Sequence, residues 1–489
     1  MTRLTGNGSA AATGALERRG RADRRPRVDW RLGWLAALAG PLLLGWLVGS
    51  HGAPPGGLLV GMACVVVLAL LFQRLLLPAL LLWVPLSVLA FPWVRVPGGQ
   101  SLVTFDRVWV GAAVLAAVLA GPSPTLRSTW SRRLSIAVGC LGLAFSARIL
   151  LTAVAVGDSA GLRAVLVDAV LLPVGSFFVA RRVISSRERF RRLAGAFTLA
   201  GAALAVIGIA ERIWGFELAS LSGGVPRYDT FVQMVRISGP YSVPEVFALN
   251  LTICFAATLY WTQARRGPAR VLGGAVAALE AVAIGLTLFR AAWLACMLVL
   301  IATVVTRRDF STRVGGSAAV VSGVLVGLYL FGGGGVLSER LGDSRNVYGR
   351  FAAYQEGWAI FRGAPLVGIG VNQFRLAQEQ VPDVAVNGVP ALTSPHSTFI
   401  SVLVEQGLLG FSALIALGVA AWFLLRDLRR RSMDREDVLA LGALRGAALA
   451  YLVMSLTLTM WPYGSSNAFF LVLLGAAAGR ADAPRGKPV

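Results

Sequence analysis

Long apolar runs dominate the chain, and each has the length of a membrane-spanning helix. A helix needs about 20 mostly apolar residues to cross the hydrocarbon core. About fourteen runs meet this requirement, separated by short polar or charged segments. They cover 33–50, 55–72, 75–93, 104–121, 134–154, 163–180, 193–210, 243–262, 271–288, 291–306, 314–331, 397–425, 439–461 and 465–479. The pattern predicts an all-α polytopic membrane protein with about 14 transmembrane helices.

Composition supports this prediction and excludes other classes. Hydrophobic residues make up 56% of the 489 residues and charged residues only 14%, against about 25% in soluble domains. The net charge of +22 comes mainly from arginines that flank apolar runs, which indicates membrane topology and argues against nucleic acid as a partner. The four cysteines lie inside apolar runs without metal-ligand spacing, so no disulfide framework or zinc site is expected; they are Cys64, Cys140, Cys254 and Cys296.

Arginine clusters between the runs predict the orientation. With both termini in the cytoplasm of an inner-membrane protein, the clusters fall in cytoplasmic loops, as the positive-inside rule requires. The expected divisions are a basic cytoplasmic tail over 1–31, transmembrane helices 1–11 over 32–331, a large extracytoplasmic loop over 332–396, transmembrane helices 12–14 over 397–480, and a cytoplasmic tail over 481–489. The two longest connections, 211–244 and 332–396, are expected outside.

The larger external loop has its own helical pattern. Apolar residues at helical spacing predict an amphipathic helix that lies against the membrane surface; they are Val347, Phe351, Tyr354, Trp358 and Phe361. A second short helix is expected near 372–380. At the end of the loop, Ser394 is expected to cap the next span and Pro395 to begin it, which puts His396 at a helix amino terminus.

Three arginines are expected near the outer face of the membrane. Arg236 precedes a span, Arg290 interrupts an apolar hairpin, and Arg350 begins the amphipathic helix. Arginine near hydrocarbon is expensive and needs a partner. Each guanidinium group can bind two phosphate oxygens at once, so the three arginines together suit a diphosphate. The alternative is snorkelling to the interface or pairing with an acid, for which Glu245, Glu356 and Glu405 are available.

Two histidines are present, and only His396 is expected to close the external loop. The positive potential of a helix amino terminus disfavours imidazolium, so the neutral ring suits a general base; a polar interfacial cap is the alternative. His51 is expected to be an interfacial residue.

Other charges inside or beside spans have simpler interpretations. Arg148 and Asp168 are expected to neutralise each other, and Asp106 and Arg107 to pair with neighbours. Glu280 has no cation near it in sequence, so it indicates either a proton-coupled site or a buried protonated carboxyl. An acidic group before a late span, Asp434, Glu436 and Asp437, fits a solvated loop better than a metal site.

Four segments resemble the O-antigen ligase and polymerase family of membrane glycosyltransferases, in the family's order. They are 236–251, beginning RISGPYS, 286–295, LTLFRAAWLA, 349–374, beginning GRFAAYQEGW, and 394–410, beginning SPHSTF. The sequence departs from the family pattern at Glu245, Phe289 and Ser397, where the family often has asparagine, serine and asparagine.

The resemblance implies transfer or polymerisation of an undecaprenyl-diphosphate-linked oligosaccharide on the extracytoplasmic face, onto a glycan or lipid acceptor, without cofactor or metal. It implies that Arg236, Arg290 and Arg350 bind the diphosphate and that His396 activates the acceptor hydroxyl, with Glu356 and Glu405 in support. Two alternatives remain open on the sequence. One is a transporter or flippase of a polyprenyl-linked glycan, with Glu280 coupling protons, and the other is a non-catalytic assembly scaffold.

Overall fold

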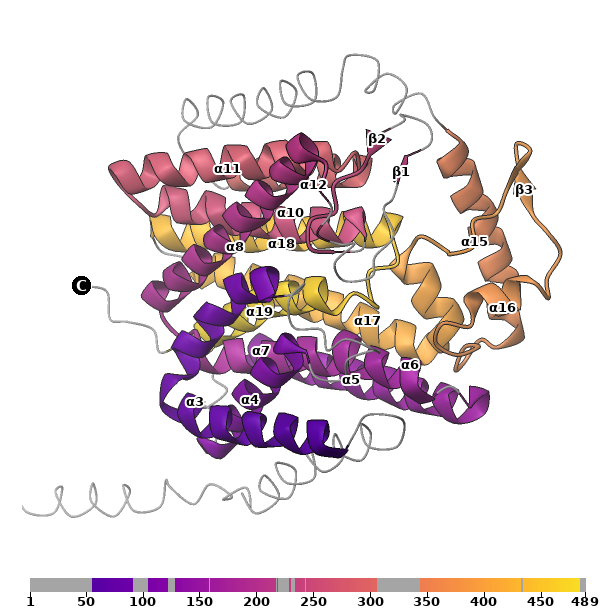
Figure 1. Cartoon of the computed structure of the whole chain (residues 1–489), viewed down its shortest axis with the longest axis horizontal. Helices are drawn as coiled ribbons and strands as arrows, with labels where there is room; N and C mark the ends of the chain where they lie inside the picture. Colours follow the sequence, from indigo (N-terminus) through magenta and orange to yellow (C-terminus); the bar gives the residue numbers. More distant parts are fainter. Residues whose placement is uncertain are drawn as a thin grey trace, which may run out of the picture.

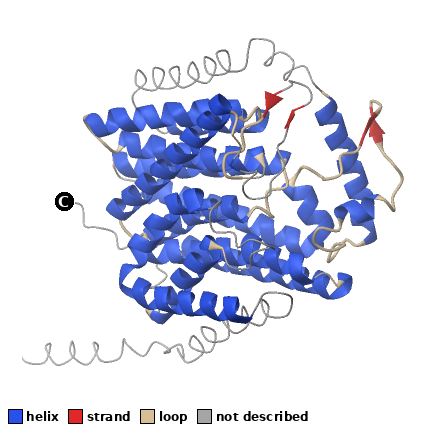
Figure 2. Ribbon diagram, viewed as in Figure 1, coloured by secondary structure: helices blue, strands red, loops and turns tan. Residues whose placement is uncertain are grey.

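The computed structural model describes most of the chain as a bundle of α-helices. The residues described are 55–90, 104–121, 128–157, 159–216, 218, 228–229, 234–241, 243–305, 344–431 and 434–483. Most helices run side by side along the long axis of the molecule, and α15 crosses their direction at one end (Figure 1). Strands are restricted, in this part of the chain, to two short hairpins near that end (Figure 2).

The helices of the bundle follow the apolar runs closely. They are α3 Pro55–Ala90, α4 Phe105–Leu119, α5 Thr129–Val156, α6 Ser159–Val165, the π-helical η1 Leu166–Leu171, α7 Leu172–Val183, α8 Arg187–Trp214, α10 Pro244–Gln263, α11 Pro268–Leu286, α12 Arg290–Val305, α17 Thr398–Arg431, α18 Arg435–Thr457 and α19 Gly464–Asp482. The connections hold α15 Arg345–Gly363 and α16 Phe374–Gln378. The antiparallel hairpins pair β1 Tyr228–Asp229 with β2 Met234–Val235, and β3 Ala385–Val386 with β4 Val389–Pro390.

Seven described helices are long and apolar enough to cross a membrane by length and composition. They are α3, over Met62–Leu89, α5, α8, α10, α11, α17 and α18, and Arg290–Thr303 is a shorter apolar helix. The protein is thus an all-α, multi-pass membrane protein. The expected spans 33–50 and 314–331 lie outside the described residues, so the total of 14 stays a prediction. The expected spans 55–72 and 75–93 are joined in α3, which is interrupted at Leu75 (φ −118°, ψ 23°).

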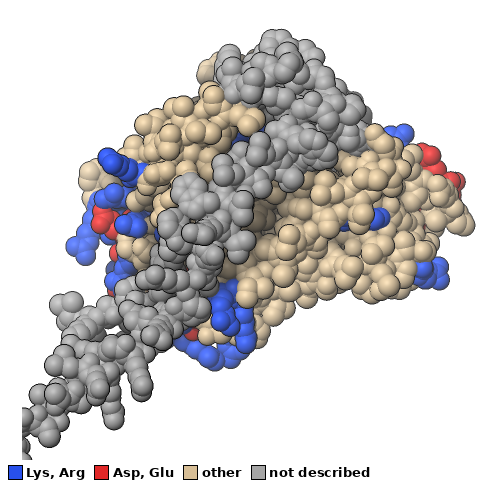
Figure 3. Space-filling view, turned by 90° about the horizontal axis from the view of Figure 1, so that it is seen from below, with Lys and Arg blue, Asp and Glu red and all other residues tan. Residues whose placement is uncertain are grey.

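The bundle has two ends of different character. Helix α15 lies at one, which we call the α15 end, with the first residues of α10, α12 and α17. The other, the C-terminal end, holds the last turn of α19 and the first turn of α8 (Figure 1). Among the residues coloured in Figure 3, Lys and Arg gather toward the left, the lower left and the right, and the tan surface between them shows few charged side chains, as expected of a bundle that spans a bilayer.

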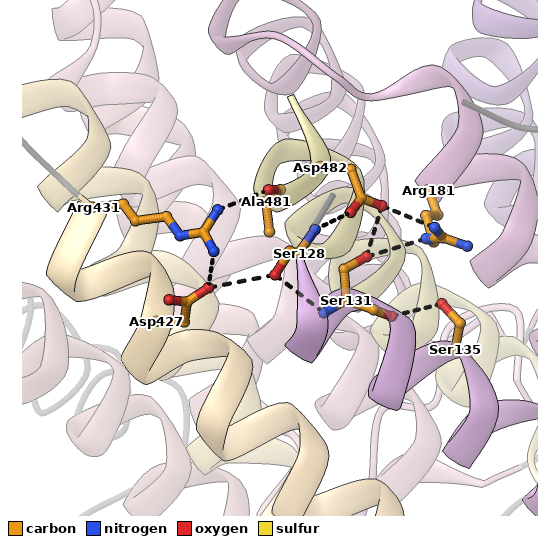
Figure 4. A network of polar contacts seen from close by, with 8 residues as sticks. All are labelled: Ser128, Ser131, Ser135, Arg181, Asp427, Arg431, Ala481 and Asp482. Carbon is orange, nitrogen blue, oxygen red and sulfur yellow. Dashed lines mark hydrogen bonds and ion pairs between the residues drawn. The ribbon is translucent and has the colours of Figure 1, made fainter. Parts of the chain in front are cut away.

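A buried polar network closes the C-terminal end (Figure 4). The carboxylate of Asp482 accepts hydrogen bonds from the backbone N–H of Ser128 at 3.0 Å and from the hydroxyl of Ser131 at 2.8 Å. It also pairs with Arg181 at 2.8 Å, and both side chains are less than 10% exposed. Helix α19 therefore continues past the expected end of its span at 479 and is fastened to α5 and α7.

The expected pairing of Arg148 with Asp168 is wrong. Asp168 in η1 accepts two hydrogen bonds from Arg107 of α4, at 2.8 and 2.7 Å. Arg148 donates instead to two backbone carbonyl oxygens, those of Gly368 at 2.7 Å and Glu405 at 3.3 Å. Asp106 accepts from the indole N–H of Trp83 at 2.8 Å. The expected neutralisation therefore occurs for Arg107, through Asp168, whereas the hydrogen bond of Asp106 is with a neutral indole.

The two carbonyls that accept from Arg148 lie at a break in α17, that of Glu405 within the helix and that of Gly368 in a loop segment beside it. Gly407 has φ 65° and ψ −167° inside the helix, a conformation that only glycine adopts readily. The segment 365–370, which begins in a turn, runs beside the break and exchanges backbone hydrogen bonds with it, from Ile369 N to Val404 O and from Leu408 N to Pro365 O, at 3.0 and 2.9 Å. We call this pairing of 365–370 with 404–409 the seam, because it joins the large loop to α17.

Candidate active site at the α15 end

Arg236 lies between two helix ends. Its Nη1 is 2.8 Å from Oε1 of Glu245, in the first turn of α10, and its Nε donates to the carbonyl oxygen of Thr287 at 3.0 Å. Both charged side chains are nearly buried, at 15% and 12% exposed. The pairing with Glu245 that the sequence left open as an alternative therefore forms. It fixes Arg236 beside the α11–α12 turn.

Arg290 is the first residue of α12 and follows directly on that turn. The turn is tight because Leu288 has φ 54°, a left-handed conformation that a branched residue rarely adopts. Strained backbone conformations of this kind occur often at functional sites, where they position a side chain. The amino termini of α10 and α12 both lie near Arg236, and each adds positive potential to that of the arginines.

Arg350, five residues into α15, completes a cationic cluster. Burial lowers the pKa of its guanidinium, the positive charges of Arg290 and Arg236 lower it further, and Tyr354 and Glu245 act in the opposite direction. These influences place the three arginines and Glu245 in one electrostatic neighbourhood. The Nε atom of Arg350 is buried and has no hydrogen-bond partner among the described residues. The structure thus brings together the three arginines, which come from distant parts of the sequence.

His396 lies at the same end but not in the expected cap. Helix α17 begins at Thr398, so Pro395 is not its first residue, and His396 precedes the helix with φ 43°. The ring is half-buried and its Nδ1 atom is enclosed. The hydroxyl of Thr398 donates to the carbonyl of Leu458 at 2.9 Å and accepts from the N–H of Met460 at 2.8 Å. The start of α17 is therefore fastened to the α18–α19 connection.

Tyr354 lies between Arg350 and Ser397, the residue that follows His396. It lies one turn after Arg350 on α15, its hydroxyl bonds to the side chain of Ser397, and it also lies 3.4 Å from the carbonyl oxygen of Leu456. Burial raises the pKa of Tyr354, against the opposing effects of Arg350 and Ser397, so the phenol stays protonated near neutral pH. The sequence pattern placed Tyr354 only in an apolar stripe, and its hydroxyl was the one signal of a polar role.

The amphipathic helix and the short helix of the loop are both present, but the stripe is divided. Val347, Phe351 and Trp358 are 41%, 52% and 55% exposed, whereas Phe361 is 8% exposed. The inward face of α15 is made mostly of small residues, together with Glu356 and Ile360; the small ones are Gly349, Ala352, Ala353 and Gly357. Contact of the exposed face with the membrane surface stays a prediction.

Glu356 and Glu405 hold the loop in place. The carboxylate of Glu356 accepts from the side-chain amide of Gln378 and, at 2.9 Å, from the backbone N–H of Val384. The carboxylate of Glu405 accepts from backbone groups of Asn372 and Phe374. Each carboxylate therefore fixes a loop segment, and Glu405 also accepts from the hydroxyl of Ser401 in its own helix at 3.4 Å. None of these partners is one of the three arginines.

Glu280 is fully buried between α8, α10 and α11. The hydroxyl of Thr258 donates to its Oε1 at 2.9 Å, and Gly201 of α8 packs so closely that a Cβ there would lie 1.7 Å from that oxygen. The acidic residues near 434–437 form ion pairs with arginines of α8 and α19: Asp434 and Asp437 with Arg187, Glu436 with Arg191, and Asp437 with Arg480. No group of three or more metal-ligating side chains occurs in the described ranges.

A cluster of arginines and a histidine at one end of the bundle of a multi-pass membrane protein provides a site suited to an anion. Residues 274–415 match the family model for O-antigen ligase. This part of the chain is therefore similar to O-antigen ligases, as the resemblance predicted, and that family indicates glycosyltransferase activity. The matched region includes Arg290, Arg350 and His396, and Arg236 lies before it. No curated protein matches the chain.

Proposed function

We propose that the protein transfers or polymerises a glycan carried on undecaprenyl diphosphate, at the extracytoplasmic face of the inner membrane. The observation that supports this most is the charge of the cluster. Three guanidinium groups and the carboxylate of Glu245 leave two positive charges. A sugar-linked polyprenyl diphosphate carries two ionised phosphate oxygens, so the donor would neutralise the cluster.

Arg236, Arg290 and Arg350 would hold the diphosphate from separate elements. Because guanidinium groups stay protonated and bind phosphate oxygens in pairs, they neutralise the negative charge that grows on the leaving diphosphate. Of the three proposed diphosphate contacts, that of Arg350 has the most support, since its buried Nε has no hydrogen-bond partner in the described part of the chain. The lowered pKa of Arg350 indicates that an anionic partner would stabilise it.

His396 would take the proton of the acceptor. In this step the acceptor hydroxyl oxygen forms a bond to the anomeric carbon, and the bond from that carbon to the diphosphate oxygen breaks. The hydroxyl proton moves to the imidazole and later to water, and the carrier leaves as polyprenyl diphosphate. General base catalysis of this kind typically contributes about 10²- to 10⁴-fold. Tyr354, through Ser397, would position the histidine.

The experiment is an assay of the purified protein with a defined undecaprenyl-diphosphate oligosaccharide. Growth of chain length with this donor alone indicates a polymerase, and transfer only to an added acceptor indicates a ligase. His396→Ala is expected to remove activity in either case. His51→Ala, which replaces the other histidine of the chain, is the matched control. Full activity of the His396→Ala variant would exclude the histidine from the reaction.

A further inference from the structure

A second cationic site lies at the C-terminal end, away from the proposed active site. A hollow of about 270 Å³ is lined by Glu188, Arg191 and Arg192 of α8 and by Arg265, which follows α10. Arg187, which precedes these residues, pairs with Asp437 at the start of α18, and this places the hollow where helices of the bundle begin and end.

The hollow holds more positive than negative charge. Arg192 pairs with Glu188, the one carboxylate of the lining. Arg191 has its Nε 3.4 Å from Glu436, and that carboxylate also accepts a hydrogen bond from Tyr260 at 2.9 Å. Three guanidinium groups around one small space repel each other, and an anion between them would relieve the repulsion.

One guanidinium group retains an unused donor. The Nε atom of Arg265 is buried and makes no hydrogen bond within the described ranges, and the buried Nε of Arg191 has only its 3.4 Å ion-pair contact with Glu436. A buried donor without a partner costs about 1–3 kcal/mol, so an acceptor entering the hollow gains more than it would at an exposed arginine. Phosphate oxygens suit this purpose because they accept several hydrogen bonds at once.

The surroundings point to a lipid as the source of the phosphate. The guanidinium carbon of Arg265 lies 5.4 Å from the centre of the Trp261 ring. Trp261 is half-buried and closely packed, since a Cβ on Gly195 would lie 3.0 Å from its indole nitrogen. Tryptophan beside arginine at the end of a spanning helix is typical of the level of lipid headgroups. We propose that this hollow binds the phosphate of an anionic phospholipid headgroup.

The test measures binding of phosphatidylglycerol to the full-length protein in detergent by native mass spectrometry. The unaltered protein is expected to retain phosphatidylglycerol in preference to phosphatidylcholine. Arg265→Gln and Arg191→Gln should each weaken retention by about 10-fold or more, the value of one charge-assisted hydrogen bond. Arg270→Gln is the matched control, because Arg270 is exposed, lies near the same end and is not part of the lining.

Three results would overturn the proposal. Equal loss in the Arg270→Gln variant would mean that general positive charge attracts the lipid. Equal retention of phosphatidylcholine would mean that the charge of the headgroup does not determine binding. Displacement of phosphatidylglycerol by millimolar inorganic phosphate would identify free phosphate as the ligand.

If Arg265→Gln does not yield folded protein, Arg265→Lys is the substitute. It keeps the charge and should still weaken retention several-fold, since lysine lacks the planar fork of arginine. Unchanged retention in that variant would also contradict the site.

Discussion

Replacement of Glu245 by glutamine tests the charge of the proposed diphosphate site. The change keeps the size of the side chain and an oxygen that accepts from Arg236, but it removes the negative charge 2.8 Å from that guanidinium. The cluster then carries three positive charges instead of two. We expect the variant to bind the donor more tightly than the unaltered protein.

The size of the effect follows from the geometry. A phosphate on the free edge of Arg236 would lie roughly 6 Å from the carboxylate of Glu245, and at an effective dielectric constant of about 20 their repulsion is about 2–3 kcal/mol. Weaker orientation of Arg236 by the neutral amide offsets about 1 kcal/mol of this. The remaining 1–2 kcal/mol, on this order-of-magnitude scale, corresponds to a Kd about 5- to 30-fold lower. Turnover should not rise, because the product diphosphate is also held more tightly.

The assay is equilibrium binding of a short-chain polyprenyl-diphosphate-linked oligosaccharide to the purified protein. Glu379→Gln is the matched control, since Glu379 is an exposed acid in the large loop and its replacement changes the net charge equally. A tenfold weaker affinity in the Glu245→Gln variant would refute the reasoning, because the carboxylate would then be needed to place Arg236.

Three further changes test the framework of the site and of the bundle. Tyr354→Phe removes the hydroxyl that bonds to Ser397 and should lower kcat about 10-fold with little change in donor Kd; an unchanged kcat would contradict its positioning role. Gly407→Ala introduces a Cβ 2.4 Å from a backbone oxygen at a positive φ, so thermal unfolding in detergent should show a loss of about 2–3 kcal/mol, whereas Gly418→Ala, where nothing lies within 4 Å, should be close to neutral. Asp482→Asn weakens a buried ion pair and should destabilise by about 2–4 kcal/mol; a change below about 0.5 kcal/mol would show that the network is not needed.

The sequence predicted the helices of the bundle because apolar length is a local property. The expected run 243–262 became α10 over Pro244–Gln263, and 271–288 became α11 over Pro268–Leu286. It also predicted that Arg290, Arg350 and His396 lie at one end, since helix order and loop lengths determine which ends meet. Their chemical roles stay predictions until the assays are made.

Partners between distant residues could not be predicted in the same way. The seam opens α17 at Gly407 because segment 365–370 supplies backbone partners there, and no local pattern within 397–425 indicates such a break. Arg148 and Asp168 are close enough in sequence to suggest a pair, yet in the folded protein Asp168 forms its ion pair with Arg107. Which acid meets which arginine depends on how helices pack, and this is not contained in the periodicity of either helix.

The most direct measurement is the donor Kd of two variants studied side by side, Arg350→Gln and His396→Gln. The account predicts that Arg350→Gln weakens donor binding by about 10-fold or more, because a charge-assisted contact with the diphosphate is lost. It predicts that His396→Gln binds the donor nearly as well as the unaltered protein while glycan transfer is lost. Unchanged donor affinity in the Arg350→Gln variant would contradict the account.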